Sequence, residues 1–274
     1  MSIYTSLKLD REPFSTSPDP AFFYKSSEHY TVLNRLEIAI RLRRGLSIIL
    51  GDVGTGKTTL LRAILQAFSL EEDYIFHMIL DPSFKSEYQF LSYLTRLFGV
   101  NPFFRSTSDH REVIEKYLFQ KCVEEQKTVV LLIDEGQKLN DAQLEILRTL
   151  LNYETNENKL LQLVILAQME LLPRIKKVHN LMDRVTLKYI INPLDEYETG
   201  KLIEFRLKQA GYSEDKKLFS DEVVRKIHQY TRGYPRQVAR LCHSAVEHLI
   251  MEDAQVVSSD LIDQIMVQEK LWNY

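Results

Sequence analysis

The stretch Gly51-Asp-Val-Gly-Thr-Gly-Lys-Thr-Thr59 decides the fold of this chain. It matches the phosphate-binding pattern G-x-x-x-x-G-K-[ST], whose fixed positions are occupied by Gly51, Gly56, Lys57 and Thr58. An apolar run at residues 46–50 leads into the first glycine, and residues 60–65 read as the first turns of a helix. A strand, a glycine loop and a helix in this order form an anion cradle, because backbone N–H groups and the helix dipole point at the phosphates.

The residue types in this loop predict its chemistry. We expect Lys57 to reach the β- and γ-phosphates of a nucleotide, and the Thr58 hydroxyl to ligate Mg²⁺. The loop as a whole is predicted to hold the phosphates, through Gly51, Asp52, Val53, Gly54, Thr55, Gly56, Lys57, Thr58 and Thr59. A chance match in a chain of this length is roughly one in a hundred, so the loop predicts a bound nucleotide with Mg²⁺.

Composition is that of an ordinary globular protein, with 274 residues, 45% hydrophobic and 27% charged. A net charge of −3 gives no global basic field of the kind that attracts nucleic acid. Local basic clusters occur at Arg41, Arg43 and Arg44 and at Lys176-Lys177, and we interpret them as solvated faces or subunit contacts.

The two cysteines, Cys122 and Cys242, lie in apolar-periodic segments far apart in the sequence and are expected to be buried thiols. No Cys/His cluster has metal-ligand spacing. The N-terminal sequence is not typical of a signal peptide, and no uncharged apolar run approaches ~18 residues. These features predict a protein with no transmembrane segment, located in the cytoplasm or at the inner membrane face as a peripheral protein.

Alternating strand and helix patterns predict a parallel five-stranded α/β sheet covered by helices on both faces. The expected strands are residues 46–50, 74–80, 129–133, 161–167 and 185–190, and the expected helices between them are 27–43, 57–68, 86–98, 110–125, 141–153 and 169–178. Beyond Asn192-Pro193 only helical patterns occur, at 195–210, 220–231, 234–251 and 258–269. We therefore expect a leader plus nucleotide-binding domain over residues 1–191 and a small all-helical domain over residues 192–274.

A second half of the nucleotide site follows the third predicted strand. Val129-Val-Leu-Leu-Ile-Asp-Glu135 is an apolar run ending in two carboxylates, about 75 residues after the glycine loop. Asp134 is predicted to hold Mg²⁺, directly or through water. Glu135 is predicted to orient and polarise the water that attacks the γ-phosphate. A carboxylate in this role argues against a pure nucleotide switch with little turnover.

Three later residues are candidates for positioning and charge near the γ-phosphate. Gln168 ends the strand expected beside the one that precedes Asp134, and is either a water-holding amide or a polar strand cap. Arg184 precedes the last strand and either stabilises transferred charge or pairs with Asp183 at the surface. Arg236 follows Pro235 in the first turn of a helix, where a cation opposes the helix dipole and needs an anionic partner.

Together these residues resemble the AAA+ ATPases. The resemblance implies that 51–58 is Walker A, that Asp134 and Glu135 form Walker B, that Gln168 is sensor 1, and that Arg184 is an arginine finger reaching a neighbouring subunit. It also implies that Gly233, Pro235 and Arg236 form a sensor-2 motif on a helical lid, and that the protein forms homo-oligomers.

The N-terminal leader sharpens this resemblance. Pro13-Phe14, Pro18-Asp19-Pro20, Phe22-Phe23-Tyr24 and His29, followed by residues 133–137 (Ile-Asp-Glu-Gly-Gln), resemble the ExeA/GspA-type ATPases. Gly136 stands where that family usually has alanine, and we expect this to cost some helix propensity and little else. Members in type II secretion also carry a transmembrane helix and a peptidoglycan-binding domain, so the resemblance covers their soluble ATPase module.

Two biological roles remain open, and they differ in partner and not in active site. The first, favoured here, is remodelling or assembly of a protein partner in cell-envelope machinery such as secretion or pilus assembly. The second is a DNA-associated regulator resembling the TniB/TnsC-type transposition helpers, which oligomerise on duplex DNA and recruit a transposase. Acidic composition disfavours DNA binding but does not exclude an oligomer that lines one surface with basic residues.

Overall fold

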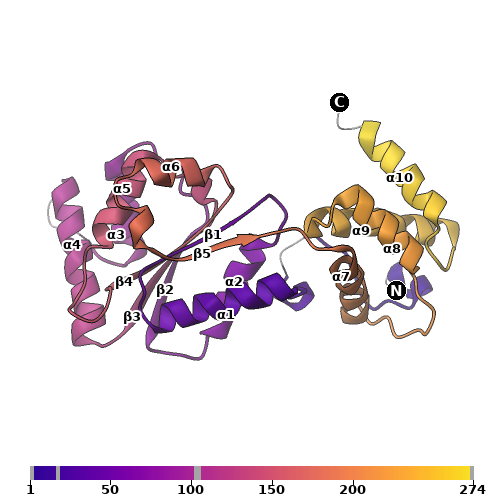
Figure 1. Cartoon of the computed structure of the whole chain (residues 1–274). Helices are drawn as coiled ribbons and strands as arrows, with labels where there is room; N and C mark the ends of the chain where they lie inside the picture. Colours follow the sequence, from indigo (N-terminus) through magenta and orange to yellow (C-terminus); the bar gives the residue numbers. More distant parts are fainter. Residues whose placement is uncertain (1–2, 17–18, 102–105, 272–274) are drawn as a thin grey trace. The chain divides into compact units, whose positions relative to one another are not determined.

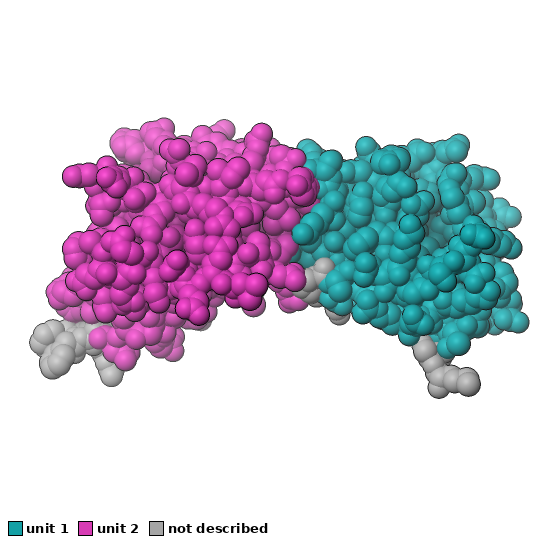
Figure 2. Space-filling model, turned by 90° about the horizontal axis from the view of Figure 1, so that it is seen from below, with its two compact units in different colours: residues 1–28, 54–59, 192–274 teal, residues 29–53, 60–191 magenta. Residues whose placement is uncertain are grey.

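The computed structural model describes residues 3–16, 19–101 and 106–271. The chain forms two compact units, which are coloured separately in Figure 2. Unit 1 comprises residues 1–28, 54–59 and 192–274, and unit 2 comprises residues 29–53 and 60–191. No helix among the described residues combines the length and the apolarity needed to cross a membrane.

Unit 2 contains one five-stranded sheet in which every paired strand is parallel. Its strands are β1 (Leu46–Gly51), β2 (Tyr74–Ile79), β3 (Thr128–Ile133), β4 (Leu161–Ala167) and β5 (Val185–Ile191), arranged in the order β2-β3-β4-β1-β5. β1, β3 and β4 are buried along their whole length, as their continuous apolar runs predict, whereas the edge strand β5 alternates between buried and exposed residues. The predicted fold class and all five predicted strands are confirmed, each strand end to within one residue.

Helices cover both faces of this sheet (Figure 1). They are α1 (Ser27–Arg41), α2 (Lys57–Ala67), α3 (Glu87–Leu97), α4 (Thr107–Phe119), α5 (Asp141–Leu150) and α6 (Leu171–Lys177). α4 starts three residues earlier than the apolar pattern predicts, because Ser106 and Asp109 form a reciprocal capping box. It continues as a π-helical turn over Gln120–Glu124.

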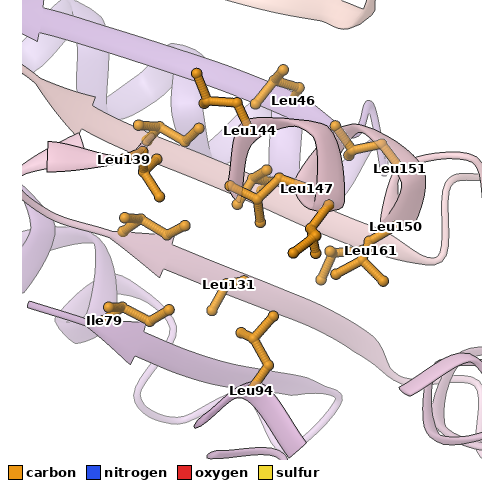
Figure 3. Packing of buried hydrophobic residues seen from close by; sticks show 14 of the residues in the cluster. Leu46, Ile79, Leu94, Leu131, Leu139, Leu144, Leu147, Leu150, Leu151 and Leu161 are labelled. Atoms are coloured by element: carbon orange, nitrogen blue, oxygen red, sulfur yellow. The ribbon is translucent and has the colours of Figure 1, made fainter. Parts of the chain in front are cut away.

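The main core of unit 2 lies between the sheet and α3 to α6. Leu144, Leu147, Leu150 and Leu151 of the α5 segment pack over the strands, as Figure 3 shows, and each is at most 1% exposed. Burying a leucine fully stabilises the fold by about 1.5–3 kcal/mol. This packing holds the strands, and therefore their carboxyl ends, in a fixed register.

Unit 1 is a helical bundle to which the leader contributes. Its helices are α7 (Glu196–Gln209), α8 (Asp221–Thr231), α9 (Pro235–Glu252) and α10 (Ser259–Leu271), with 3₁₀ turns at Ile3–Leu7 and Pro20–Phe22. Leader residues Leu7, Leu9, Phe14 and Phe22 join the same hydrophobic core as these helices.

An aromatic contact and a hydrogen bond also hold the leader in unit 1. Phe14 packs edge-on against Phe219 at 5.7 Å, and Arg206 Nη1 donates to the Ser15 carbonyl at 2.9 Å. The sequence predicts that the leader belongs to the α/β domain, but its described residues, 3–16 and 19–28, belong to the same compact unit as the C-terminal helices. The functional division into a nucleotide-binding domain over 1–191 and a lid over 192–274 stays a prediction.

Candidate functional site

The predicted site residues of unit 2 gather at the carboxyl edge of the sheet. Gly51 ends β1, and Asp134 and Gln168 directly follow β3 and β4. β4 pairs with both neighbours, so Leu50 lies beside Ala167 and Ile133 beside Ile165. The expectation that the strand before Gln168 runs beside the strand before Asp134 is confirmed. Carboxyl ends of parallel strands are where open α/β sheets bind ligands.

The backbone turns sharply after β3. Asp134 is 3% exposed, and its N–H donates to the Ile79 carbonyl at 2.8 Å, which extends the pairing with β2. Glu135 then adopts left-handed backbone angles, φ 52° and ψ 34°. Such a conformation costs a non-glycine residue about 1–2 kcal/mol. In this turn the Glu135 N–H donates to Asp134 Oδ1 at 2.9 Å. Strain of this kind clusters at functional sites.

Gln137 is a polar residue of this edge to which sequence reasoning gave no role. Its Nε2 donates to Glu135 Oε2 at 2.6 Å, and its Oε1 accepts from the Gln168 backbone N–H at 3.0 Å. The side chain therefore links the end of β3 to the end of β4. Gln137 belongs to the segment Ile133-Asp-Glu-Gly-Gln137, but no pattern in the sequence predicts that the turn brings the Gln137 amide back to the Glu135 carboxylate.

Gly136 lies so close to β4 that a side chain at this position would clash. A Cβ built on this glycine would lie 2.4 Å from Ile165 Cγ2, 3.2 Å from the Leu166 carbonyl oxygen and 3.3 Å from Ala167 Cβ. The prediction that glycine here costs helix propensity and little else is therefore wrong. Ile165 fills the space that an alanine methyl would need, so the turn packs directly onto β4.

Arg184 lies in the 3₁₀ turn Met182–Arg184 before β5 and is partly buried. Its Nε is buried and has no hydrogen-bond partner among the described residues, and no ion pair to Asp183 is present among them. The pKa of Glu145 is lowered by hydrogen bonds from Arg148, with smaller contributions from the charges of Arg111 and Arg184. The surface pair with Asp183 is thus not formed, and the finger role of Arg184 stays a prediction.

Two of the three clustered arginines are engaged inside unit 2. Arg41 forms ion pairs with Glu37 and Glu71 at 2.9 and 2.7 Å. Arg43 Nε donates to Thr128 Oγ1 at 3.0 Å, and its Nη2 donates to the Gln126 carbonyl at 3.1 Å. Arg43 therefore stabilises the start of β3 through these hydrogen bonds, which is a structural role.

The remaining predicted residues belong to unit 1, where the second half of the glycine loop meets the start of α9. Gly54 has φ +85°, and its carbonyl accepts from the Arg236 N–H at 3.3 Å. A Cβ at Gly54 would lie 3.0 Å from Arg236 Cβ, so glycine permits this approach. The Lys57 residue begins α2 and is 7% exposed. Pro235 opens α9, as predicted, and Arg236 is exposed.

Gly233, two residues before Pro235, has φ +73°, and a Cβ on it would lie 1.8 Å from the Leu194 carbonyl oxygen. The Leu194 N–H donates to the Gly233 carbonyl at 2.9 Å. The glycine of the predicted sensor-2 motif, Gly233, is therefore required by its close approach to the Leu194 backbone, just before the first turn of α9.

Comparisons with known proteins agree with this architecture. The AAA domain family model matches residues 40–175. General secretion pathway protein A of Aeromonas hydrophila is 32% identical over 242 residues, a match that covers 87% of this chain and 43% of that protein. The chain thus spans less than half the length of this relative.

Solved structures share the fold at low identity. The ORC2 protein of Aeropyrum pernix, in ADPNP–ADP complexes, superimposes with a TM-score of 0.66 and 15% identity, covering 93% of this chain and 71% of that one. The Drosophila ORC bound to DNA gives a TM-score of 0.67 and 21% identity, covering 94% and 64%. With the sheet order, the glycine loop and the paired carboxylates described above, the chain resembles the AAA domain family over residues 40–175 and is similar to general secretion pathway protein A.

Proposed function

We propose that the protein binds Mg-ATP and hydrolyses it. The observation that carries this proposal is the order of the strand ends, where the glycine loop follows β1, Gln168 follows β4, and Asp134 and Glu135 follow β3, on three adjacent strands. This arrangement supplies a phosphate cradle and acidic groups at one edge of one sheet.

The donor set fits magnesium and a nucleotide. Asp134 is a buried carboxylate, and Thr58 is a hydroxyl on the first turn of α2; hard oxygen ligands of these kinds suit Mg²⁺, which neutralises phosphate charge when it is bound. Lys57 contributes a charge for the β- and γ-phosphates. Glu135 accepts a proton from the attacking water, Gln168 positions that water, and Arg236 contributes positive charge near the γ-phosphate.

The experiment that tests this proposal compares Lys57→Ala with Glu135→Gln. Lys57→Ala is expected to abolish tight ATP binding, because the cradle loses its side-chain cation. Glu135→Gln is expected to keep ATP binding and lose turnover, because an amide cannot take up the proton. Nucleotide affinity is measured by fluorescence titration and turnover by phosphate release. Equal loss of affinity in both variants would contradict the assigned roles.

The partly buried Arg184 guanidinium is assigned to a neighbouring subunit's γ-phosphate, in an oligomer whose sites are shared. Arg184→Ala should then bind ATP and lose hydrolysis by roughly 10³–10⁵. Mixing it with Lys57→Ala should restore part of the rate, since some interfaces pair two intact halves. If the two variants co-assemble but show no rescue, the role of Arg184 at a neighbouring subunit is wrong. Arg236 is then the principal candidate for stabilising the charge of the γ-phosphate.

For biological role, we propose remodelling or assembly of a protein partner in cell-envelope machinery. The likeness to general secretion pathway protein A supports this, as does the engagement of Arg41 and Arg43 in contacts within unit 2. Duplex DNA is the competing partner. Exposed Arg44, Lys176 and Lys177 are the residues to reverse in a binding assay, because changing Arg43 would also loosen β3. DNA binding tighter than ~10⁻⁶ M at physiological salt, weakened by these reversals, would overturn the proposed role.

A further inference from the structure

The amide of Gln137 occupies a position that the nucleotide chemistry above does not use. It lies in the 3₁₀ turn Gly136–Lys138, two residues after Glu135, and touches the carboxylate of Glu135 on one side and the backbone of Gln168 on the other. All three residues belong to unit 2, so the contacts are internal to one compact body.

Hydrogen-bond chemistry fixes the orientation of this amide. The Gln168 N–H can only donate, so the atom of Gln137 facing it at 3.0 Å must be the oxygen. The amide nitrogen then faces Glu135 Oε2 at 2.6 Å, where it can only donate. A hydrogen bond from a neutral amide to a carboxylate is charge-assisted and among the stronger contacts a side chain makes.

The turn that carries Gln137 is itself held from two directions. Gly136 packs against Ile165 of β4 with no space for a methyl group. Arg174 of α6 donates through Nη1 to the carbonyl oxygens of Gln137 and Leu139, both at 2.9 Å. Because backbone and side chain are both restrained, the Gln137 amide is presented to Glu135 in a preorganised position.

From this geometry we infer that Gln137 is a positioning residue for Glu135. It binds Oε2 and so directs the other carboxylate oxygen, Oε1, toward the water, while its bond to the Gln168 backbone keeps the carboxylate in register with the end of β4. The inference rests on the proposed hydrolysis with Glu135 as proton acceptor. It adds a side chain that acts through Glu135 and does not touch the nucleotide.

Two substitutions at this position separate positioning from simple structural support. Gln137→Met has a similar size and lacks both polar groups. Gln137→Glu keeps an oxygen that accepts from the Gln168 N–H but replaces the donor by a second carboxylate facing Glu135. If Gln137 acts through Glu135, Gln137→Met lowers kcat roughly ten- to a hundredfold and Gln137→Glu lowers it further. If it only caps the Gln168 N–H, Gln137→Glu retains more activity than Gln137→Met.

The measurement is steady-state ATP turnover together with nucleotide affinity on the whole chain. We expect KM and affinity to change less than about twofold, because the Walker A cradle is intact. In a Glu135→Gln background, Gln137→Met should lower the residual rate no further, since the group it positions is already lost. Gln66→Met, an exposed glutamine-to-methionine change on α2, is the matched control and should keep the wild-type rate.

The outcomes distinguish this inference from the proposed function. If the wild-type protein binds ATP and does not hydrolyse it, both the proposed function and the inference are wrong. Wild-type turnover with Gln137→Glu more active than Gln137→Met, or with equal further loss in the Glu135→Gln background, overturns the positioning role alone. Thermal unfolding of each variant checks that the losses of rate occur in folded protein.

Discussion

Two turns of the molecule, one in each unit, are built alike and differ in what surrounds their glycine. In unit 2, left-handed Glu135 (φ 52°) precedes Gly136, and in unit 1, left-handed Arg232 (φ 50°) precedes Gly233. Each turn leads into a helical segment carrying a residue with a proposed part in nucleotide chemistry. Neither glycine has space for a methyl group.

The obstacles differ in kind. Gly136 faces first a side-chain methyl, Ile165 Cγ2, and it has no left-handed φ. Gly233 has φ +73° and faces the backbone carbonyl oxygen of Leu194. The Leu194 N–H also donates a hydrogen bond to the Gly233 carbonyl. A side chain can be exchanged or can shift, whereas a backbone carbonyl in a paired segment cannot. The first glycine is therefore replaceable at a cost, and the second is structurally obligatory.

The largest expected effect is that of Gly233→Ala. The new methyl group would strike the Leu194 carbonyl and must also adopt a left-handed conformation, so we expect a loss of about 3 kcal/mol or more in the free energy of unfolding. Chemical denaturation measures it. Gly99→Ala is the matched control, because Gly99 has φ +72° with open space around it and should lose only about 1 kcal/mol. Equal losses in the two variants would break the comparison.

Gly136→Ala is expected to have the next largest effect. The methyl group overpacks the contact with Ile165, which costs about 1–3 kcal/mol, and displaces the turn carrying Gln137. A lower midpoint of thermal unfolding and a lower ATP turnover should therefore appear together. Unchanged stability would mean that β4 yields freely at Ile165, against the burial of that residue at 1% exposure.

A compensating change at Ile165 sharpens the contrast between the glycines. Ile165→Leu moves the branch away from Cβ and removes the Cγ2 methyl group at nearly constant volume, which alone should cost less than about 1.5 kcal/mol. Combined with Gly136→Ala it should recover roughly 1 kcal/mol relative to the sum of the single losses. A double-mutant cycle of unfolding free energies measures this coupling. Strict additivity would show that the obstacle at Gly136 is the Leu166 carbonyl and not the side chain.

Arg232→Gly is expected to have the smallest effect, and in the opposite direction. Arg232 is the exposed left-handed residue that ends α8, a position that glycine occupies without the strain of a Cβ. We expect a gain of about 0.5–1 kcal/mol in unfolding free energy. Destabilisation would indicate that the arginine side chain makes a contact that outweighs its backbone strain.

The sheet was predictable because it depends on local patterns. β1, β3 and β4 are continuous apolar runs bounded by polar residues, and such runs specify strands buried on both faces. The fixed spacing of the glycine loop and the Asp-Glu pair after a strand predicted the chemistry for the same reason. In contrast, the cost of a methyl at Gly136 depends on Ile165, a distant residue that no local pattern identifies.

The role of Gln137 and the placement of the leader were unpredictable for a related reason. A glutamine two residues after a carboxylate reaches back to it only when the intervening backbone is left-handed, and Glu135 is not a residue type that predicts such a turn. Leader residues such as Phe14 have an apolar character that requires burial, but the sequence does not say against which helices.

The packing of the leader affects how the chain folds during synthesis. Leader residues such as Leu7 and Phe14 leave the ribosome more than 200 residues before their core partners Phe219 and Leu249. At 5–20 residues per second the leader waits roughly ten to fifty seconds before its core can close. Throughout that interval the apolar side chains of the leader lack these native partners and are open to chaperones and to misassembly.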